Sequence, residues 1–223
     1  MCNKKYHRQV PLLLFIALCI AAIIYGQEKQ DDPVLDFYCN RAKAVYPTLN
    51  PFDNGAALSF LVRSYLTELK RRGREIVTDS SIVRYYFSYG YLDSQQIITS
   101  TTDELTGLDF AYPNMFDRDY YFNFFPNDTG GDAIAIGVDS DSTRGYTPVG
   151  IAVINRSHYY LLRLYLYFPG PNKYERYSKE MSFVNYGGVV FPDTIRVTFA
   201  RAGIFSTQYY RRETIVDSLV VGP

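Results

Sequence analysis

The most regular hydrophobic pattern in the chain lies between Tyr146 and Phe168. Two runs of β-forming residues flank a short polar break, Asn155-Arg156-Ser157, and this is the pattern of a β-hairpin. In the second run, period-two alternation predicts one wholly apolar face and an opposite face rich in tyrosine. The apolar face holds Leu162, Leu164, Leu166 and Phe168, and the other holds Tyr159, Leu161, Arg163, Tyr165 and Tyr167.

Two helices are predicted before the strands begin. Asp32-Pro33 is a helix-start signal, and apolar residues then recur at helical spacing until Pro47, where the helix is expected to end. A second helix is predicted from Gly55 to Arg72, with Gly73 as the residue that closes it. The apolar positions are Val34, Phe37, Tyr38, Ala42 and Val45 in the first, and Ala57, Leu58, Leu61, Val62, Tyr65, Leu66 and Leu69 in the second.

The remainder of the chain predicts about eight to ten antiparallel strands separated by turn signals such as Gly187-Gly188. No alternation of strands and helices is present, so the fold class is α+β, with N-terminal helices packed on an antiparallel sheet. In the first strand Val83, Tyr85, Phe87, Tyr89 and Tyr91 share one face. Further strands are expected at 95–102, 120–125, 133–138, 181–186, 189–191, 194–200, 204–211 and 214–221.

Residues 1–26 have the layout of a secretory signal peptide. Lys4, Lys5 and Arg8 precede an apolar run, and Gly26 is a small residue before a polar stretch. The apolar run from Val10 to Tyr25 is shorter than the about 20 residues that a membrane-spanning helix needs. Export with cleavage near Gly26 is therefore expected, which leaves 27–223 as one domain in the periplasm or cell envelope.

The charge balance and the cysteines narrow the function further. The whole chain has 23 basic and 23 acidic residues, and removal of the signal takes three cations and no acid. The resulting slightly acidic protein lacks the basic surface that a nucleic-acid partner requires. Cys2 and Cys19 leave with the signal, so Cys39 stands alone, and neither an intrachain disulfide nor a cysteine metal site is expected.

Each short motif that suggests catalysis or metal binding has a plainer interpretation. Asp128-Thr129-Gly130 matches the tripeptide of aspartic proteases but follows Pro126-Asn127, which favours a turn. Asp139, Asp141 and Thr143 alternate as calcium ligands do, yet Arg144 stands where a calcium loop needs glycine. His158 lacks triad partners that the sequence can place. We expect no catalytic residue, no metal and no cofactor.

Tyrosine is abundant, with 22 residues, whereas tryptophan is absent. Rows of aromatic side chains stack on sugars, line apolar grooves, or pack beneath helices. The absence of tryptophan weakens the first of these, because tryptophan offers the best stacking face. Packing of the strands under the 55–72 helix remains an alternative to any ligand.

The order of these elements resembles the LolA-like lipoprotein-carrier superfamily, which includes LolA, LolB and RseB. The resemblance rests on Gly150-Ile-Ala-Val-Ile-Asn155, on Leu161-Leu-Arg-Leu-Tyr-Leu, and on Gly188-Val-Val-Phe-Pro-Asp-Thr-Ile-Arg-Val197, and it extends over roughly residues 34–221. It implies a curved half-barrel whose concave face is capped by helices and binds acyl chains or a partner. The residues that it would turn inward are Leu162, Leu164, Leu166, Ile195, Val197 and Phe199.

The sequence therefore predicts an exported, non-enzymatic envelope protein that binds an acyl chain, a lipoprotein or another apolar ligand in a half-barrel. Contact with a membrane surface is compatible with this prediction. The alternative is a periplasmic or cell-surface interaction module that binds glycans through exposed tyrosines. A filled sheet face would favour the alternative, and a pocket lined by the even-numbered leucines would favour the carrier.

Overall fold

The computed structural model describes residues 33–52, 55–70, 74–108, 120–124, 131–140, 149–168, 177–202 and 206–222. These residues form one α-helix, α2 (Pro33–Leu49), a short 3-10 helix, η2 (Asp103–Leu105), and ten strands. The strands are β1 (Ala57–Leu69), β2 (Glu75–Ser88), β3 (Tyr91–Ser100), β4 (Tyr120–Phe124), β5 (Ala133–Ser140), β6 (Val149–Asn155), β7 (Leu161–Phe168), β8 (Tyr177–Tyr186), β9 (Val189–Ala202) and β10 (Thr207–Gly222).

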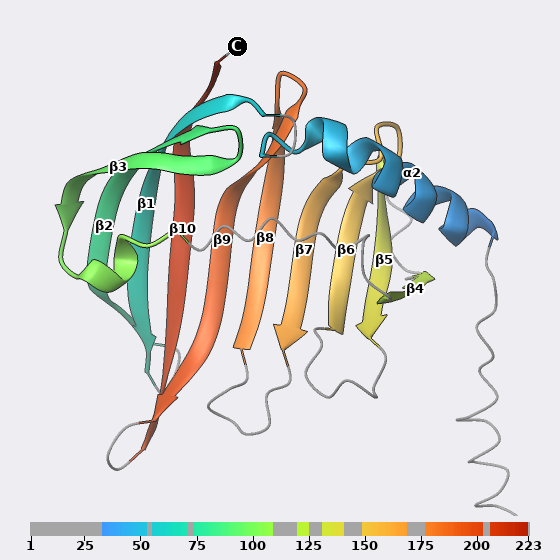
Figure 1. Ribbon diagram of the computed structural model, residues 1–223. Coiled ribbons are helices and arrows are strands. Elements are labelled where there is room, and N and C mark those ends of the chain that lie inside the picture. Colours follow the sequence, from blue (N-terminus) through green and yellow to red (C-terminus); the bar gives the residue numbers. More distant parts are fainter. Residues whose placement is uncertain are drawn as a thin grey trace, which may run out of the picture.

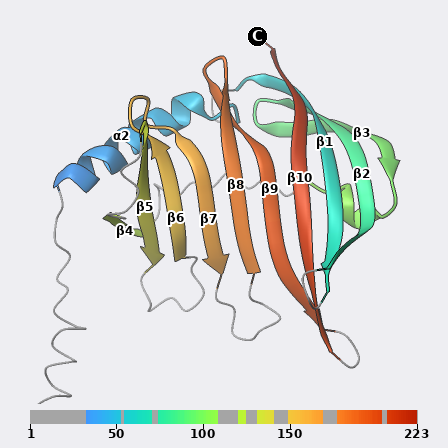
Figure 2. The ribbon, with the colours of Figure 1, turned by 180° about the vertical axis from the view of Figure 1, so that it is seen from behind.

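All ten strands belong to one antiparallel sheet of order β3-β2-β1-β10-β9-β8-β7-β6-β5-β4. The sheet is a meander with one exception, because the chain passes from β3 at one edge to β4 at the other. The last strand, β10, then pairs with the first, from Ala57↔Gly222 to Leu69↔Tyr209. Figure 1 shows an open, curved sheet, and Figure 2 shows the same sheet from behind, with α2 on its far side.

Helix α2 lies on the concave side, across one end of the strands from β5 to β8 (Figure 1). Its buried residues are Leu35, Ala42 and Tyr46, which recur on one face of the helix. The first helix of the sequence is thus confirmed, although its apolar stripe is shifted, since Val34 and Phe37 are exposed. Pro47 was expected to end the helix but lies inside its last turn, which continues to Leu49.

The helix predicted from Gly55 to Arg72 is wrong, because these residues contain strand β1. Leu58, Val62 and Leu66 are four residues apart, and a spacing of four fits both a helical stripe and one face of a strand. Phe60 separates the two interpretations. It lies outside the helical stripe but on the period-two face, and it is 0% exposed between β10 and β2.

The predicted strand around Val83–Tyr91 is confirmed as far as Phe87 and ends in a turn. Val83, Tyr85 and Phe87 are buried, whereas Tyr89 and Tyr91 are exposed. Tyr89 and Gly90 both have positive φ, 52° and 80°, as a two-residue hairpin turn requires. A Cβ on Gly90 would lie 2.6 Å from the Phe52 carbonyl oxygen, so the turn packs against the segment that follows α2.

The later strands are confirmed, and several are longer than predicted. The runs at 189–191 and 194–200 form the single strand β9, because Pro192 and Asp193 are accommodated by a register shift opposite Ser182 and Phe183. The runs predicted at 204–211 and 214–221 likewise form one strand from Thr207 onward, β10, and residues 204–205 lie outside the described ranges. The hairpin predicted around Asn155-Arg156-Ser157 is β6–β7. In its turn, Asn155 Oδ1 accepts hydrogen bonds from the Ser157 and His158 amides at 3.0 and 2.8 Å.

Several predictions concern residues outside the described ranges. They are the signal peptide at 1–26, the Asp128-Thr129-Gly130 turn, the loop from Asp141 to Arg144, and Gly73. Among the described residues, no helix has the length and apolar character needed to cross a membrane.

The assignment of 57–69 to a strand leads to a stability prediction. We expect Phe60→Ala to lower the free energy of unfolding by about 3–5 kcal/mol, because the ring is fully buried among aromatic neighbours. Arg63→Ala on the opposite face is the control and should cost about 0–1 kcal/mol, since it removes only an exposed ion pair with Asp217. Urea unfolding measures both, and equal losses would contradict the strand.

Gly150 gives a second prediction, because β6 and β7 approach closely at this residue. A Cβ on Gly150 would lie 1.8 Å from the Tyr165 carbonyl oxygen, a distance that requires the backbone to move. Gly150→Ala should therefore destabilise the protein by about 1–3 kcal/mol. The control is Gly107→Ala, where a Cβ meets nothing within 4 Å. Thermal unfolding that is equal for the two variants would contradict the close approach.

Candidate ligand-binding face

The concave side of the sheet, on which α2 packs, carries a row of apolar side chains five strands wide. Neighbouring strands place these residues directly beside one another, and four of the five are at most 1% exposed. We call this set the apolar row; it consists of Ile136, Ala152, Leu164, Met181 and Ile195.

The apolar row ends at β9. On β10, β1 and β2 the residues at the same level of the sheet carry hydroxyl groups. Ile195 pairs with Thr214, which pairs with Ser64, which pairs with Ser81. Ser64 and Thr214 hydroxyls lie 3.4 Å apart, and Ser81 Oγ donates to the Leu105 carbonyl of η2 at 2.9 Å. Because these hydroxyls are engaged within the protein, the apolar surface available on this row is limited to β5 through β9.

A second row, toward the end of the strands away from α2, alternates apolar and cationic residues. It runs Leu166, Lys179, Val197, Arg212 across β7 to β10. Lys179 is only 8% exposed. Arg212 Nη2 donates to the Gly107 carbonyl at 2.6 Å and thereby ties β10 to the segment after η2.

A third row is aromatic and partly exposed. It consists of Phe168, Tyr177, Phe199 and Tyr210, adjacent across β7 to β10, and we call it the aromatic row. The Phe168 and Tyr177 rings stack with centroids 4.2 Å apart, and Arg201 lies 5.2 and 4.9 Å from the Phe199 and Tyr210 rings. Arg201 also forms an ion pair with Glu104 of η2.

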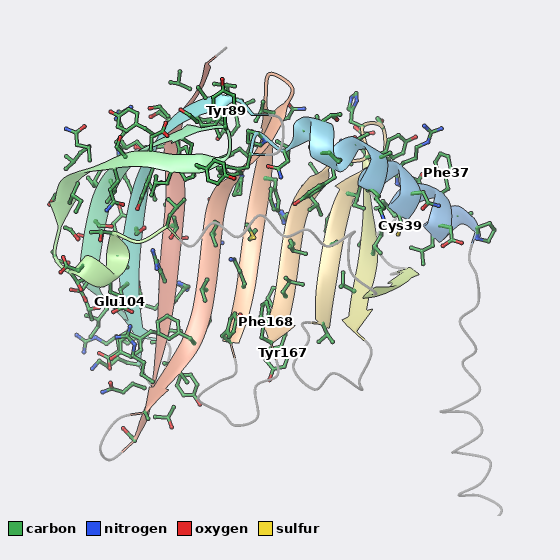
Figure 3. The ribbon with its side chains drawn as sticks, viewed as in Figure 1. Phe37, Cys39, Tyr89, Glu104, Tyr167 and Phe168 are labelled. Carbon is green, nitrogen blue, oxygen red and sulfur yellow. The ribbon has the colours of Figure 1, made fainter. Side chains whose placement is uncertain are left out.

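The aromatic row lies at the end of the concave side that is remote from α2. Figure 3 shows Phe168 at the end of β7 that is remote from α2, whereas Cys39 and Phe37 mark the helix at the opposite end. Tyr177 is 37% exposed at this end. The concave side is therefore covered by a helix at one end and bordered by aromatic rings at the other.

Of the six residues that the resemblance turns inward, four lie in or against one core cluster and two lie outside it. Leu164, Leu166 and Ile195 are buried in one core cluster, and Val197 packs against it. Phe199 belongs to the aromatic row and is half-buried. Leu162 is half-buried outside the cluster, because a register shift lets Leu161 pair with Ile154 and leaves Leu162 as the extra residue.

Sequence alternation missed some members of this face. Leu161 was assigned to the tyrosine side but is 4% exposed and belongs to the core cluster, and the bulge is the reason. Met181 and Ala152 were not singled out, although their place opposite Leu164 follows once the register is known. Strand register is not visible in the spacing of one strand alone.

One small cavity among the described residues lies between α2 and the sheet. The cavity there has a volume of about 10 Å³ and is lined by Ala42, Val45, Tyr46, Leu49, Tyr159, Tyr160, Leu161 and Val190. Such a volume holds about one water molecule. At this place the sheet face is filled, which by the criterion stated above favours the interaction module, and a ligand under this helix would require the helix to move.

The opposite, convex side is polar. Tyr165 and Tyr167 are exposed there, so the tyrosine side of the hairpin is a solvent-facing surface and not a second buried face. Arg196 Nε donates a hydrogen bond to Glu213 Oε1 at 2.6 Å, and Arg196 Nη1 lies 3.9 Å from Glu180 Oε2. A shallow depression of about 520 Å³ is lined by Tyr165, Ser178, Glu180, Arg196, Thr198, Arg211 and Glu213.

Among the described residues, no group of three or more histidine, cysteine or acidic side chains is placed to hold a metal ion. His158 is exposed in the β6–β7 turn, and its ring stacks on Tyr160 at 6.4 Å. Cys39 is a free, half-buried thiol on α2. Burial, and secondarily the nearby Asp36 carboxylate, raises the pKa of the Cys39 thiol to about 12.

The structure matches several solved structures at low identity. The first, described as an outer membrane lipoprotein-sorting protein domain from Vibrio parahaemolyticus, is 13% identical and has a TM-score of 0.42 over 82% of this chain and 91% of that one. A LolA superfamily protein from Nitrosomonas europaea is 13% identical, with a TM-score of 0.38 over 83% and 92%. A DUF1329 family protein from Desulfovibrio piger is 8% identical, with a TM-score of 0.36 over 83% and 92%.

These likenesses are of low identity and concern the fold alone. No family model matches the sequence. No curated protein matches it either.

The Cys39 environment predicts a pH dependence of stability. An unfolded thiol has a pKa of about 8.5, and the folded pKa lies at about 12. The folded state therefore holds the proton more tightly, so this contribution to stability is complete below about pH 8.5 and is lost as the pH rises toward 12.

The measurement is the free energy of unfolding in urea at pH 8 and at pH 10.5, for the wild type and for Cys39→Ser. The wild type should lose more stability over this interval than the variant, because tyrosines and lysines titrate in both proteins and only the thiol differs. The same loss in both proteins would show that α2 does not bury the thiol.

Proposed function

We propose that this chain is an exported, non-enzymatic carrier that binds an acyl chain, free or attached to a lipoprotein, on the concave side of its half-barrel. The acyl chain would contact Leu164, Leu166, Ile195, Val197 and Phe199, and Leu161 in place of the bulged Leu162. The ligand class is apolar, and no cofactor is required.

One observation carries this proposal: the apolar row leads toward a partly exposed aromatic row at the end that α2 leaves open. If the sheet face served only as a core, the aromatic side chains at its edge would be expected to be buried, because burying apolar area is favourable at about 25 cal/mol per Å². Tyr177 instead remains 37% exposed beside Phe168 and Phe199. These rings offer a hydrocarbon chain a path toward Leu166 and Val197.

Helix α2 supports the same function as a displaceable cover. Only three of its 17 residues are buried, and they are Leu35, Ala42 and Tyr46. Full burial of a large apolar side chain is worth about 1.5–3 kcal/mol, so such a contact is small enough for a bound acyl chain to replace. An acyl chain longer than the open end accommodates would then take the place of the helix on Leu161 and Val190.

A second candidate function is the interaction module, and the depression on the convex side favours it. Tyr165 is 47% exposed there, beside the hydroxyls of Ser178 and Thr198 and the carboxylates of Glu180 and Glu213. A ring that stacks on a sugar, next to hydrogen-bonding groups, is a common arrangement for a glycan. This site and the concave side lie on opposite faces of one sheet, so variants can separate them.

The test is a titration of the protein with a fluorescent fatty acid, together with native mass spectrometry of protein purified from membranes. The wild type should bind the probe and retain lipid. Tyr177→Asp should raise the Kd about tenfold, because a charge beside the entering chain must be desolvated, a cost of about 1.4 kcal/mol or more.

The matched control is Tyr165→Asp, which introduces the same charge at an exposed tyrosine on the convex side. It should leave the Kd for the fatty acid unchanged. A wild type that neither binds the probe nor carries lipid would refute the carrier function. If Tyr165→Asp instead abolishes binding to a glycan array that the wild type recognises, the interaction module replaces it.

A further inference from the structure

Strand β3 is an edge strand with an unusual surface. It ends the sheet on the side opposite β4, and no described strand pairs with its outer edge (Figure 1). Every residue from Tyr91 to Thr99 is exposed. The exposed fractions are 77% for Tyr91, 48% for Leu92, 50% for Ile97 and 53% for Ile98, so apolar side chains lie on the surface on both sides of the polar middle of the strand.

Proteins usually protect such an edge with lysine, proline, a short strand or bulges. The other edge strand, β4, is short, at five residues. Strand β3 has ten residues and contains neither proline nor a basic residue. Its protection is confined to two register shifts against β2 and to Asp93, whose carboxylate accepts a hydrogen bond from Ser88.

The register shifts leave the middle of the strand regular. Between them, Ser94, Gln95, Gln96 and Ile97 pair in sequence with Tyr86, Tyr85, Arg84 and Val83. A regular segment with an open outer edge presents unpaired backbone N–H and C=O groups, and another extended strand satisfies these groups best. The occupant of this edge is therefore a β-strand, and not a helix or a small molecule.

We propose that the occupant is β3 of a second copy of this chain, paired antiparallel about a two-fold axis so that the two sheets become one. The charges of β3 do not oppose such self-pairing. Asp93 is the only charged residue in β3, and pairing centred on Gln96 sets it opposite Thr99 of the other copy. No like charges then face each other, and Gln95 lies opposite Ile97 on either side of the axis.

The experiment is light scattering after size-exclusion chromatography of the full protein, over a range of concentrations. The wild type should form a dimer. Ile97→Lys should raise the dimer Kd at least about tenfold, because it places two like charges close to the axis. Val77→Lys is the matched control, since Val77 is 60% exposed on β2 beyond the residues that pair with β3, and it should leave the dimer intact.

A charge-swap pair makes the test specific to this edge. Ile97→Lys and Ile97→Glu should each be monomeric alone and should form a heterodimer when mixed, because opposite charges then meet near the axis. A wild type that is monomeric at every concentration, or a dimer that Ile97→Lys leaves intact, would overturn the proposal. So would a monomer whose β3 instead binds an extended segment of a different protein.

Discussion

The pairing of β1 with β10 is the interaction on which the rest of the structure depends. It joins strands that lie 150 residues apart at Ser64 and Thr214, and it continues over the full length of β1. On one side of it stands the β1–β3 meander, and on the other the meander from β4 to β10. Without this pairing neither meander would have its neighbour, and the concave side would be divided between two separate sheets.

This pairing also sets the boundary between two kinds of interior. From β5 to β9 the inward side chains are aliphatic and meet α2, whereas from β10 to β2 hydroxyls and the anchored η2 segment take over at the same level of the sheet. Aromatic rings around Phe60 and Tyr85 form a second cluster on β1 and β2, against which Phe52 packs. One continuous backbone layer thus supports an aliphatic region under α2 and a hydroxyl and aromatic region beside η2.

Sequence patterns predicted most of the strands but not the status of β1. Hydrophobic positions four residues apart in Ala57–Leu69 satisfy a helix and a strand equally, and the polar Ser64 interrupts the alternation that would have decided it. Only the long-range partners on both sides, β10 and β2, make the strand the better state. Predicting 57–69 as a helix also removed the partner that β10 needs, so the error was topological as well as local.

The inward residues were predictable where a strand is regular and failed where it is bulged. Leu164, Leu166 and Ile195 lie in register and are buried as alternation predicts. Leu161 and Leu162 lie at a bulge, so alternation exchanges their environments. Likewise, Pro192-Asp193 has the composition of a turn, yet a bulge lets the strand continue through it. A bulge depends on two strands together, and a single strand's pattern does not contain it.

The late position of β10 in the chain has a consequence for the order in which the protein can fold. During synthesis β1 is made well before its partner β10, since the paired residues Ser64 and Thr214 are 150 residues apart. Until then both β1 and β9 have an open edge, and contacts between distant residues are slow to form. The ten strands can consequently become one continuous sheet only after β10 has been made.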